Sequence, residues 1–270
     1  MSKYLNVFNT LAEYQAFSAS TEYVQPNVAL VKETNVLYYD YGNNKPQPNY
    51  TDYKVSSRSL VSDGGDTYGL GEKLFLNYIP SGVTSLESAF SYWSSLQEVT
   101  CELPSGVTDM FSTFRACKSL VTSPKIPSGV TRMTSTFMSC YSLVNAPKIP
   151  SSVTNLSNTF RDCSSLVNAP EIPNSVTDMG FTFRNCSSLI TAPNIPSSVT
   201  SLNYTFDGCN RLKEVTFLHT TPPSYSSTLD NCPSLESIYV QDESVDTYKT
   251  ATGWSEFADK IKPLSSKPTK

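Results

Sequence analysis

Apolar residues recur along most of the chain with a period of 23 residues. In the copy from Pro150 to Ile172, Leu156, Phe160 and Cys163 stand at positions i, i+4 and i+7, the spacing of one face of a helix. Thr154 precedes them and suits a helix N-cap, because its hydroxyl can accept a hydrogen bond from a free amide of the next turn. The pattern therefore predicts a short helix in each copy.

An extended stretch such as LVNAPEIP follows each cysteine. In this copy Leu166, Ala169 and Ile172 should point inward while their neighbours face solvent. Stacked copies would pair these stretches into a parallel sheet with strands about 4.8 Å apart. Proline has no N–H to donate, so the sheet should be narrow or interrupted at the proline of each copy. These prolines are Pro124, Pro147, Pro170 and Pro193.

A fixed period of this length is typical of a solenoid, in which each unit shares its core with the copies beside it. We therefore expect an α/β solenoid in which each turn contains a short parallel strand, a proline corner and a short helix. About seven turns would give a rod or arc roughly 35 Å long. The first copy has Trp93 where the others have cysteine, as expected of a repeat at an array end.

The evenly spaced cysteines are interpreted as small core residues, because free cysteine is among the most buried residue types. Helices packed 8–10 Å apart are too distant for disulfides, and the paired C-x2-4-C spacing of zinc sites is absent from the sequence. Cys101 lies outside the series. The series is Cys117, Cys140, Cys163, Cys186, Cys209 and Cys232.

Catalytic chemistry has little support in the sequence. His219 is the single histidine and is expected in a solvated loop beside Pro222 and Pro223. No nucleophile elbow is present, and GGDTYGLGEK lacks the spacing of dinucleotide-binding and P-loop motifs. Acidic residues occupy different positions in different copies. We expect no enzyme activity, no cofactor and no metal site.

Composition excludes two classes of partner. The net charge of −4 gives no basic surface for nucleic acid, and no apolar run is long enough to insert into a membrane. The first residues show no uninterrupted apolar segment of the kind found in signal peptides, so we expect the cysteines to be reduced.

Residues 1–60 carry no period and are expected to form a small α+β module that ends in a turn-rich linker. Thr10 and Glu13 form a possible capping box for a short helix that carries Leu11 and Phe17. VALV and VLYY read as two strands of a hairpin. So little apolar content is marginal for an independent domain, which suggests packing against a partner or a copy of itself. The candidate anchoring residues are Val28, Leu30, Val36, Leu37, Tyr38 and Tyr39.

Residues that vary between copies define a candidate ligand-facing surface along the predicted sheet. Stacked rows of Asn, Thr and Tyr suit hydrogen bonding to sugars, although an ordinary solvated face explains them equally well. The candidates are Thr122, Asn145, Asn168 and Thr191 in one row, Lys125, Lys148, Glu171 and Asn194 in a second, and Tyr141 after a cysteine.

The F-x-x-C-x-S-L core and the I-P corner resemble the BspA-like leucine-rich repeats of Bacteroidetes and related bacteria over about residues 75–262. The segment SLESIYVQDESVDTYKTATGWSEFADKIKP is similar to the terminal segment of that family. The resemblance implies a leucine-rich-repeat-like solenoid over 61–240 and a C-terminal cap and tail over 241–270. A last strand, 238–240, should lead into a helix from about Ser244, with Trp254, Phe257 and Ile261 covering the final repeat.

The phrase EYVQPNVALVKETNVLYYDYG resembles an N-terminal module of virion proteins from crAss-like and other Bacteroidales phages, over about residues 8–42. This resemblance implies a structural virion protein, a head fibre or capsid decoration, assembled in the host cytoplasm. Residues 1–60 would bind a capsid or other virion protein, in a homotrimer. The repeats would contact host-surface glycan or protein with avidity from many copies.

Three alternatives remain open. One is a tail-associated phage fibre. Another is a bacterial cell-surface adhesin, the usual role of BspA-like repeats. The last is an intracellular scaffold for protein interactions.

Overall fold

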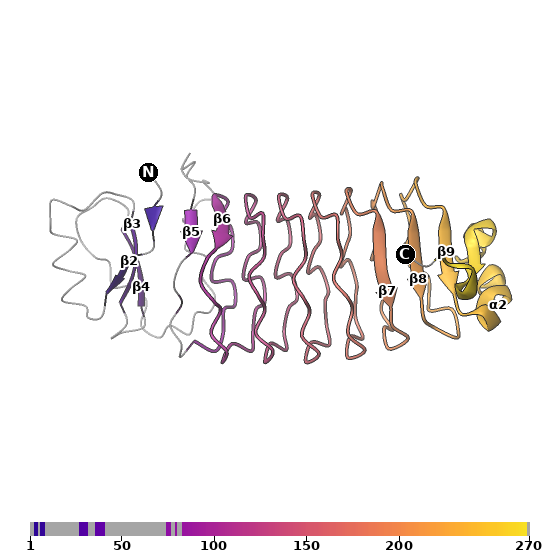
Figure 1. Cartoon of the computed structure of the whole chain (residues 1–270), viewed down its shortest axis with the longest axis horizontal. Helices are drawn as coiled ribbons and strands as arrows, with labels where there is room; N and C mark the ends of the chain where they lie inside the picture. The colour runs from indigo at the N-terminus through magenta and orange to yellow at the C-terminus, as the bar shows by residue number, and fades with distance from the viewer. Residues whose placement is uncertain are drawn as a thin grey trace.

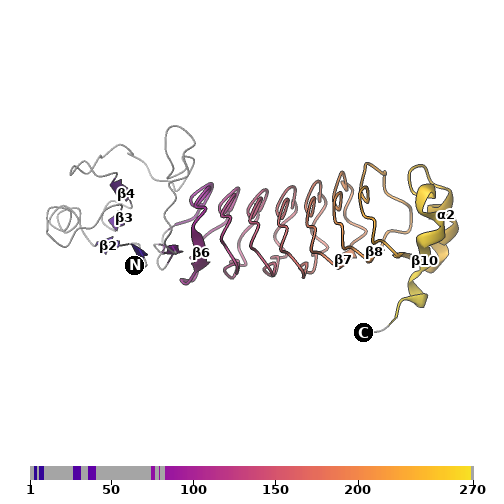
Figure 2. The ribbon, with the colours of Figure 1, turned by 90° about the horizontal axis from the view of Figure 1, so that it is seen from above.

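The computed structural model describes residues 83–268, residue 79 and the backbones of five short strands that precede them. From residue 83 onward the chain winds into a row of similar coils stacked along one axis, with short helices at the C-terminal end (Figures 1 and 2). The five preceding strands are β1 (Lys3–Tyr4), β2 (Asn6–Phe8), β3 (Asn27–Val31), β4 (Val36–Asp40) and β5 (Leu74–Leu76).

One side of the coils, which we call the strand wall, consists of residues 189–195 and their equivalents. It contains β6 (Leu96–Val99), β7 (Thr191–Ile195), β8 (Glu214–Phe217) and β9 (Ser237–Val240). β5 pairs in parallel with β6, and β7, β8 and β9 pair in parallel with one another. The predicted parallel pairing of the extended stretches is thus confirmed.

Between β6 and β7 the strand wall is reduced to single parallel bridges. Thr122 pairs with Asn145, Asn145 with Asn168, and Asn168 with Thr191. Pro124, Pro147 and Pro170 follow these bridges, and a proline removes one donor from the ladder. Pro193 lies inside β7, where the register with β8 shifts between Thr191 and Asn194. The sheet is therefore interrupted as the sequence predicts.

The opposite side of the coils, which we call the turn wall, consists of residues 178–186 and their equivalents. Here the predicted short helix is wrong. Leu156 to Cys163 form consecutive turns, with positive φ at Asn158 (57°) and Asp162 (62°). Thr154 is exposed and starts no helix.

Backbone hydrogen bonding explains why turns replace the helix. The N–H groups of Leu156 and Phe160 donate to carbonyls of the following coil, at 2.8 and 3.0 Å, whereas Thr159 N donates within its own coil to Leu156 O at 2.9 Å. In a helix, N–H groups beyond the first turn would donate within the segment, whereas the turn conformation uses alternate N–H groups to join the coils. Stacking of the coils therefore decides the local structure.

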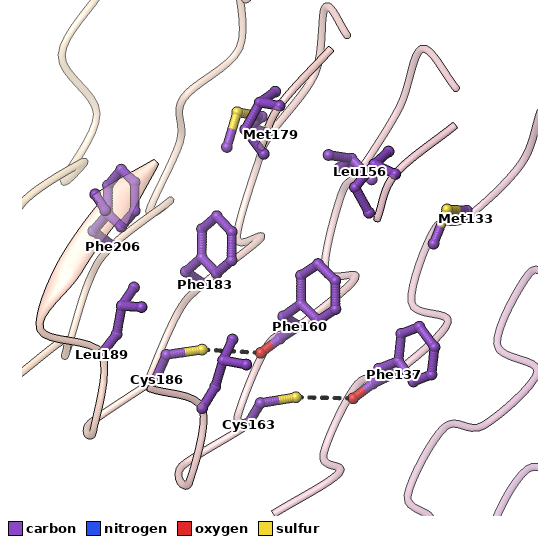
Figure 3. Packing of buried hydrophobic residues seen from close by; sticks show 14 of the residues in the cluster. Met133, Phe137, Leu156, Phe160, Cys163, Met179, Phe183, Cys186, Leu189 and Phe206 are labelled. Carbon is purple, nitrogen blue, oxygen red and sulfur yellow. Dashed lines mark hydrogen bonds between the residues drawn. The ribbon is translucent and has the colours of Figure 1, made fainter. Parts of the chain in front are cut away.

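The core between the two walls is a column of phenylalanine rings (Figure 3). Phe114, Phe137, Phe160, Phe183 and Phe206 are fully buried, and successive centroids are 5.6, 5.7, 5.6 and 5.6 Å apart. The rings of Phe137 and Phe160 are 1° from parallel. One ring per coil thus forms a continuous stack, with buried Leu, Met and Cys beside it.

A row of buried threonines, which the sequence analysis did not identify, runs beside this stack. Thr182 is fully buried, and its Oγ1 donates to Leu156 O at 2.9 Å and is 2.8 Å from Met179 O. Each hydroxyl thus joins its coil to the one before. The other members are Thr113, Thr136, Thr159, Thr205 and Thr228.

We expect the substitution Thr182→Val to lower the free energy of unfolding by about 1–3 kcal/mol, because it removes a buried donor while keeping the side-chain shape. Thr177→Val, an exposed position of the same coil, should change it by less than about 0.5 kcal/mol. Urea unfolding followed by circular dichroism measures both. Equal effects at the two positions would contradict the role of the buried row.

The C-terminal end closes the stack with β9, η1 (Asp242–Ser244), α2 (Val245–Thr250), η2 (Ser255–Lys260), β10 (Ile261–Pro263) and η3 (Leu264–Ser266). Trp254 and Ile261 are buried, and Phe257 is partly buried against the core. Trp254 packs edge-on against Phe217 at 5.0 Å, and its Nε1 donates to Pro223 O at 2.7 Å. Ile261 belongs to β10, which extends the sheet in parallel beyond β9, a strand that the sequence analysis did not predict.

β3 and β4 form the antiparallel hairpin expected from VALV and VLYY. Val28 lies opposite Tyr39, and Leu30 opposite Leu37. β2 adds to β3 in parallel. Thr10, Leu11, Glu13 and Phe17, assigned to a helix from the sequence, lie outside the described residues, as does the segment GGDTYGLGEK at 64–73.

Candidate ligand-binding surface

The strand wall brings the predicted row of Asn and Thr side chains together. Thr122, Asn145 and Asn168 are exposed, and Thr191 is half-buried. Asn168 Nδ2 donates to Asn145 Oδ1 at 2.9 Å, so the two amides are held in line by each other. Each Asn retains further donor and acceptor capacity toward solvent.

The second predicted row lies on the same segments, three residues further along each coil. Its members are exposed and differ in charge from coil to coil. Two neighbouring coils present lysine, the next presents glutamate and the last presents asparagine. Along the solenoid axis this row therefore changes from basic to acidic and then to neutral. The row consists of Lys125, Lys148, Glu171 and Asn194.

A row of aliphatic residues beside these positions was missed by the sequence analysis. Val121 and Val144 are 45% and 36% exposed, and Val167 and Ile190 are half-buried. Val144 N donates to Val121 O at 3.2 Å, and Val167 N to Val144 O at 3.0 Å, so the side chains are neighbours. The signal was present in the sequence, because each of these residues follows a buried leucine directly and so falls on the opposite face.

Tyr141 adds an exposed aromatic side chain to the same coil as Val144, three residues before it. Its side chain is 43% exposed, and Lys118 Nζ lies 6.0 Å from the centroid of its ring. Val121, Tyr141 and Val144 are three of the five most exposed large hydrophobic residues in the described part of the chain. We call this patch, together with the Asn/Thr row, the strand-wall surface. It combines apolar contact area with amide and hydroxyl groups, which is the composition of a binding surface.

The cysteines contribute nothing to this surface. All six of the series are buried and free, and the Sγ of each lies 3.1 Å from the carbonyl oxygen of the residue at the phenylalanine position in the preceding coil (Figure 3). Burial raises the pKa of these thiols, to about 12 for Cys232, so they are protonated at neutral pH. The interpretation as core residues is confirmed. Cys101 is half-buried, and burial raises its pKa too.

The expectation of a solvated His219 is wrong. The side chain is only 7% exposed, and its Nε2 lies 2.7 Å from Val199 O. Burial lowers the pKa of His219, which keeps the ring neutral at pH 7. Through this contact the imidazole joins the segment after β8 to the preceding coil.

Residues 83–268 contain no cluster of three His, Cys, Asp or Glu side chains arranged to hold a metal ion. No helix among them is both long and apolar enough to cross a bilayer. The absence of enzyme activity stays a prediction.

The predicted anchoring residues lie in β3 and β4. The backbone register places Ala29 opposite Tyr38 and Val31 opposite Val36, next to the pairs given above. The six residues are thus brought together on one hairpin. Their role in anchoring stays a prediction.

Solved structures similar to this chain include two leucine-rich repeat proteins. One is a leucine-rich cell surface protein from Faecalibacterium prausnitzii A2-165, with 23% identity over 66% of this chain and 63% of that one, and a TM-score of 0.33. The other is a leucine-rich repeat protein from Bacteroides ovatus ATCC 8483, with 22% identity over 64% and 58%, and a TM-score of 0.38. This chain thus spans less than two thirds of either protein. Comparison with curated proteins found no match.

Family membership follows from the repeat sequence. The model of the BspA-type leucine-rich repeat region matches residues 74–190 and 134–252, with six copies, which is more than half of the chain. The matched residues include the phenylalanine column, the buried cysteines and the strand wall. The protein belongs to the BspA-type leucine-rich repeat family.

Proposed function

We propose that the protein is a surface-displayed adhesion protein of the bacterial cell-surface type, which binds its partner through the strand-wall surface. The observation that carries the proposal is the exposed pair Val121 and Val144, next in the chain to the row of Asn and Thr, with the exposed Tyr141 in the same coil as Val144. Exposed apolar side chains in contiguous coils are costly on a surface without a partner. Repeat arrays commonly use such extended faces for binding.

The experiment is binding of the full chain to immobilised mucin glycoprotein by biolayer interferometry. The double substitution Val121→Lys and Val144→Lys should weaken binding at least 10-fold, because it places two charges in the apolar patch. The matched control, Thr131→Lys with Thr154→Lys, alters two exposed threonines away from the patch and should leave binding unchanged. Equal binding by all three proteins, or no binding to mucin at all, would refute the proposal.

The phage hypothesis is a second candidate, and its structural support is the β3–β4 hairpin in the segment that resembles virion proteins. Nothing in the comparisons supports that resemblance. Under this hypothesis residues 1–60 anchor a homotrimer to a capsid or other virion protein, and residues 61–240 and 241–270 form the displayed solenoid and its cap. Light scattering on the purified full chain distinguishes the two, because a monomer argues against the trimeric fibre.

A further inference from the structure

The turn wall carries two aromatic residues at a backbone position that disfavours them. The first left-handed residue of each coil has φ between 50° and 60° in all seven coils. A bulky side chain is strained there, whereas Asn tolerates this conformation. Five coils place Ser or Asn at the position, and two neighbouring coils place Phe181 and Tyr204. The equivalent residues are Ser88, Ser112, Ser135, Asn158 and Ser227.

The fold does not require these two rings. Phe181 and Tyr204 point away from the phenylalanine column, since Phe181 is half-buried and Tyr204 is 36% exposed. Their rings stack on each other with centroids 5.0 Å apart and planes 10° from parallel. Five coils stack equally well with small residues at this position. A strained backbone conformation that the packing of the core does not require often marks a functional position.

Arginine side chains border the ring pair. Arg184 Cζ lies 5.8 Å from the Phe181 centroid and 5.4 Å from that of Tyr204. Since the centroids are 5.0 Å apart, similar distances to both place this guanidinium beside the stack and not on its outer face. Arg161 Cζ lies 5.9 Å from Phe181. In the following coil the equivalent position is Ser227, which has no ring to continue the stack.

Each arginine is balanced by a carboxylate. Arg184 Nε donates to Asp207 Oδ2 at 2.9 Å, and Arg161 Nε lies 3.5 Å from Asp162 Oδ2. Asp207 is buried, and its second oxygen accepts from Asn231 Nδ2 at 2.7 Å, so this carboxylate neutralises Arg184 and does not face a ligand. The Arg184 side chain is 32% exposed, so the site offers guanidinium donors beside an apolar ring face without net positive charge. This combination disfavours phosphate-rich ligands, which need uncompensated positive charge. It matches a pyranose sugar, which presents an apolar C–H face and a rim of hydroxyl groups.

We propose that Phe181 and Tyr204 form a carbohydrate subsite on the turn wall, with Arg184 at its rim and Asp207 holding that guanidinium in place. The sugar ring lies against the exposed face of Tyr204, and the guanidinium of Arg184 donates to its hydroxyls. The subsite deepens the adhesion function proposed above and rests on it for its biological role. It is distinct from the strand-wall surface, because the two lie on different segments of each coil.

The test is saturation-transfer NMR of the full chain with methyl β-D-glucopyranoside and methyl β-D-galactopyranoside. Adenosine monophosphate serves as a comparison ligand that has a planar base and a phosphate but no pyranose ring. We expect transfer to the axial ring protons of at least one sugar and none to the nucleotide. In the double variant F181N/Y204N this transfer should fall at least 10-fold. Its melting temperature should stay within about 3 °C of the parent or rise, because Asn suits the left-handed backbone. The control Tyr141→Asn, an exposed aromatic on the strand wall, should keep the transfer.

Several outcomes would overturn the subsite: transfer to neither sugar, equal transfer in F181N/Y204N, or transfer to the nucleotide alone. A large drop in the melting temperature of F181N/Y204N would show that the two rings also stabilise the fold. The saturation transfer of the single variant Y204N then decides: loss of transfer supports the subsite, and unchanged transfer overturns it. Mucin binding separates this proposal from the adhesion function. If the strand-wall surface carries adhesion, the Val121→Lys and Val144→Lys variant loses mucin but keeps the sugar signal.

Discussion

Raising the pH above about 8.5 should unfold this protein steeply, with a reductant present throughout. Each buried thiol of the cysteine series has its pKa raised by burial, so the folded state keeps it protonated while the unfolded chain ionises. A raised pKa gives stability that is fully present below the unfolded value of about 8.5 and is lost as the pH rises above it.

The size of the effect follows from the number of thiols. Six thiols at about 1.4 kcal/mol per pH unit give a loss of about 8 kcal/mol per unit above pH 8.5. That is comparable with the whole stability of a typical domain, about 5–15 kcal/mol. The loss continues until the folded-state pKa values are reached, which for Cys232 is about 12.

Urea unfolding at a series of pH values between 7 and 10 measures this slope. Cys163→Ala is the matched control, since it removes one buried thiol and should reduce the slope by about one sixth. The pH dependence of the free energy of unfolding gives the number of protons that the parent protein releases on unfolding. A value below about three would mean that the thiols ionise in the folded state. Rapid modification of the native protein by a thiol reagent would lead to the same conclusion.

Truncating one ring of the phenylalanine column should destabilise the protein by about 3–5 kcal/mol. Phe160→Ala is the most informative substitution, because Phe160 is fully buried between Phe137 and Phe183, with centroids at 5.7 and 5.6 Å. The change leaves a cavity that the flanking coils cannot close, since their spacing is set by backbone hydrogen bonds on both walls. For a chain of this size the melting temperature should fall by roughly 6–20 °C.

Differential scanning calorimetry and urea unfolding measure the loss. The control is Tyr141→Ala, which removes an aromatic ring from the exposed strand wall and should cost less than about 1 kcal/mol. If Phe160→Ala and Tyr141→Ala have similar effects, the column is not the main source of stability. Phe160→Leu, which refills most of the space, should recover much of the lost stability.

The candidate site was predictable only in part. Periodicity placed Thr122, Asn145, Asn168 and Thr191 in one row, and the parallel bridges confirm that placement. Val121 and Val144 were overlooked as binding residues, although each directly follows an inward leucine and is therefore expected on the solvent face of the strand. The structure confirms that both are exposed.

The aromatic pair on the turn wall was also beyond sequence reasoning. Phe181 and Tyr204 are ordinary residues in the sequence, and the 23-residue spacing between them is shared by every position. Their significance depends on a left-handed backbone at that position, which a helical interpretation of the segment excluded. Because the segment was predicted to be helical, the proposed subsite at Phe181 and Tyr204 was not identified from the sequence.

The sequence by itself determined the period, the inward residues, the parallel order of the strands and the burial of the cysteines, because a hydrophobic pattern repeated at one interval has one way to share a core. Only the tertiary structure determined the backbone conformation between Leu156 and Cys163 and the burial of His219. The spacing of one face of a helix is equally compatible with successive turns, and the choice depends on where the N–H groups find acceptors. In this protein alternate N–H groups donate to carbonyl groups of the next coil. The sequence of a single copy of the repeat does not show that these acceptors are present.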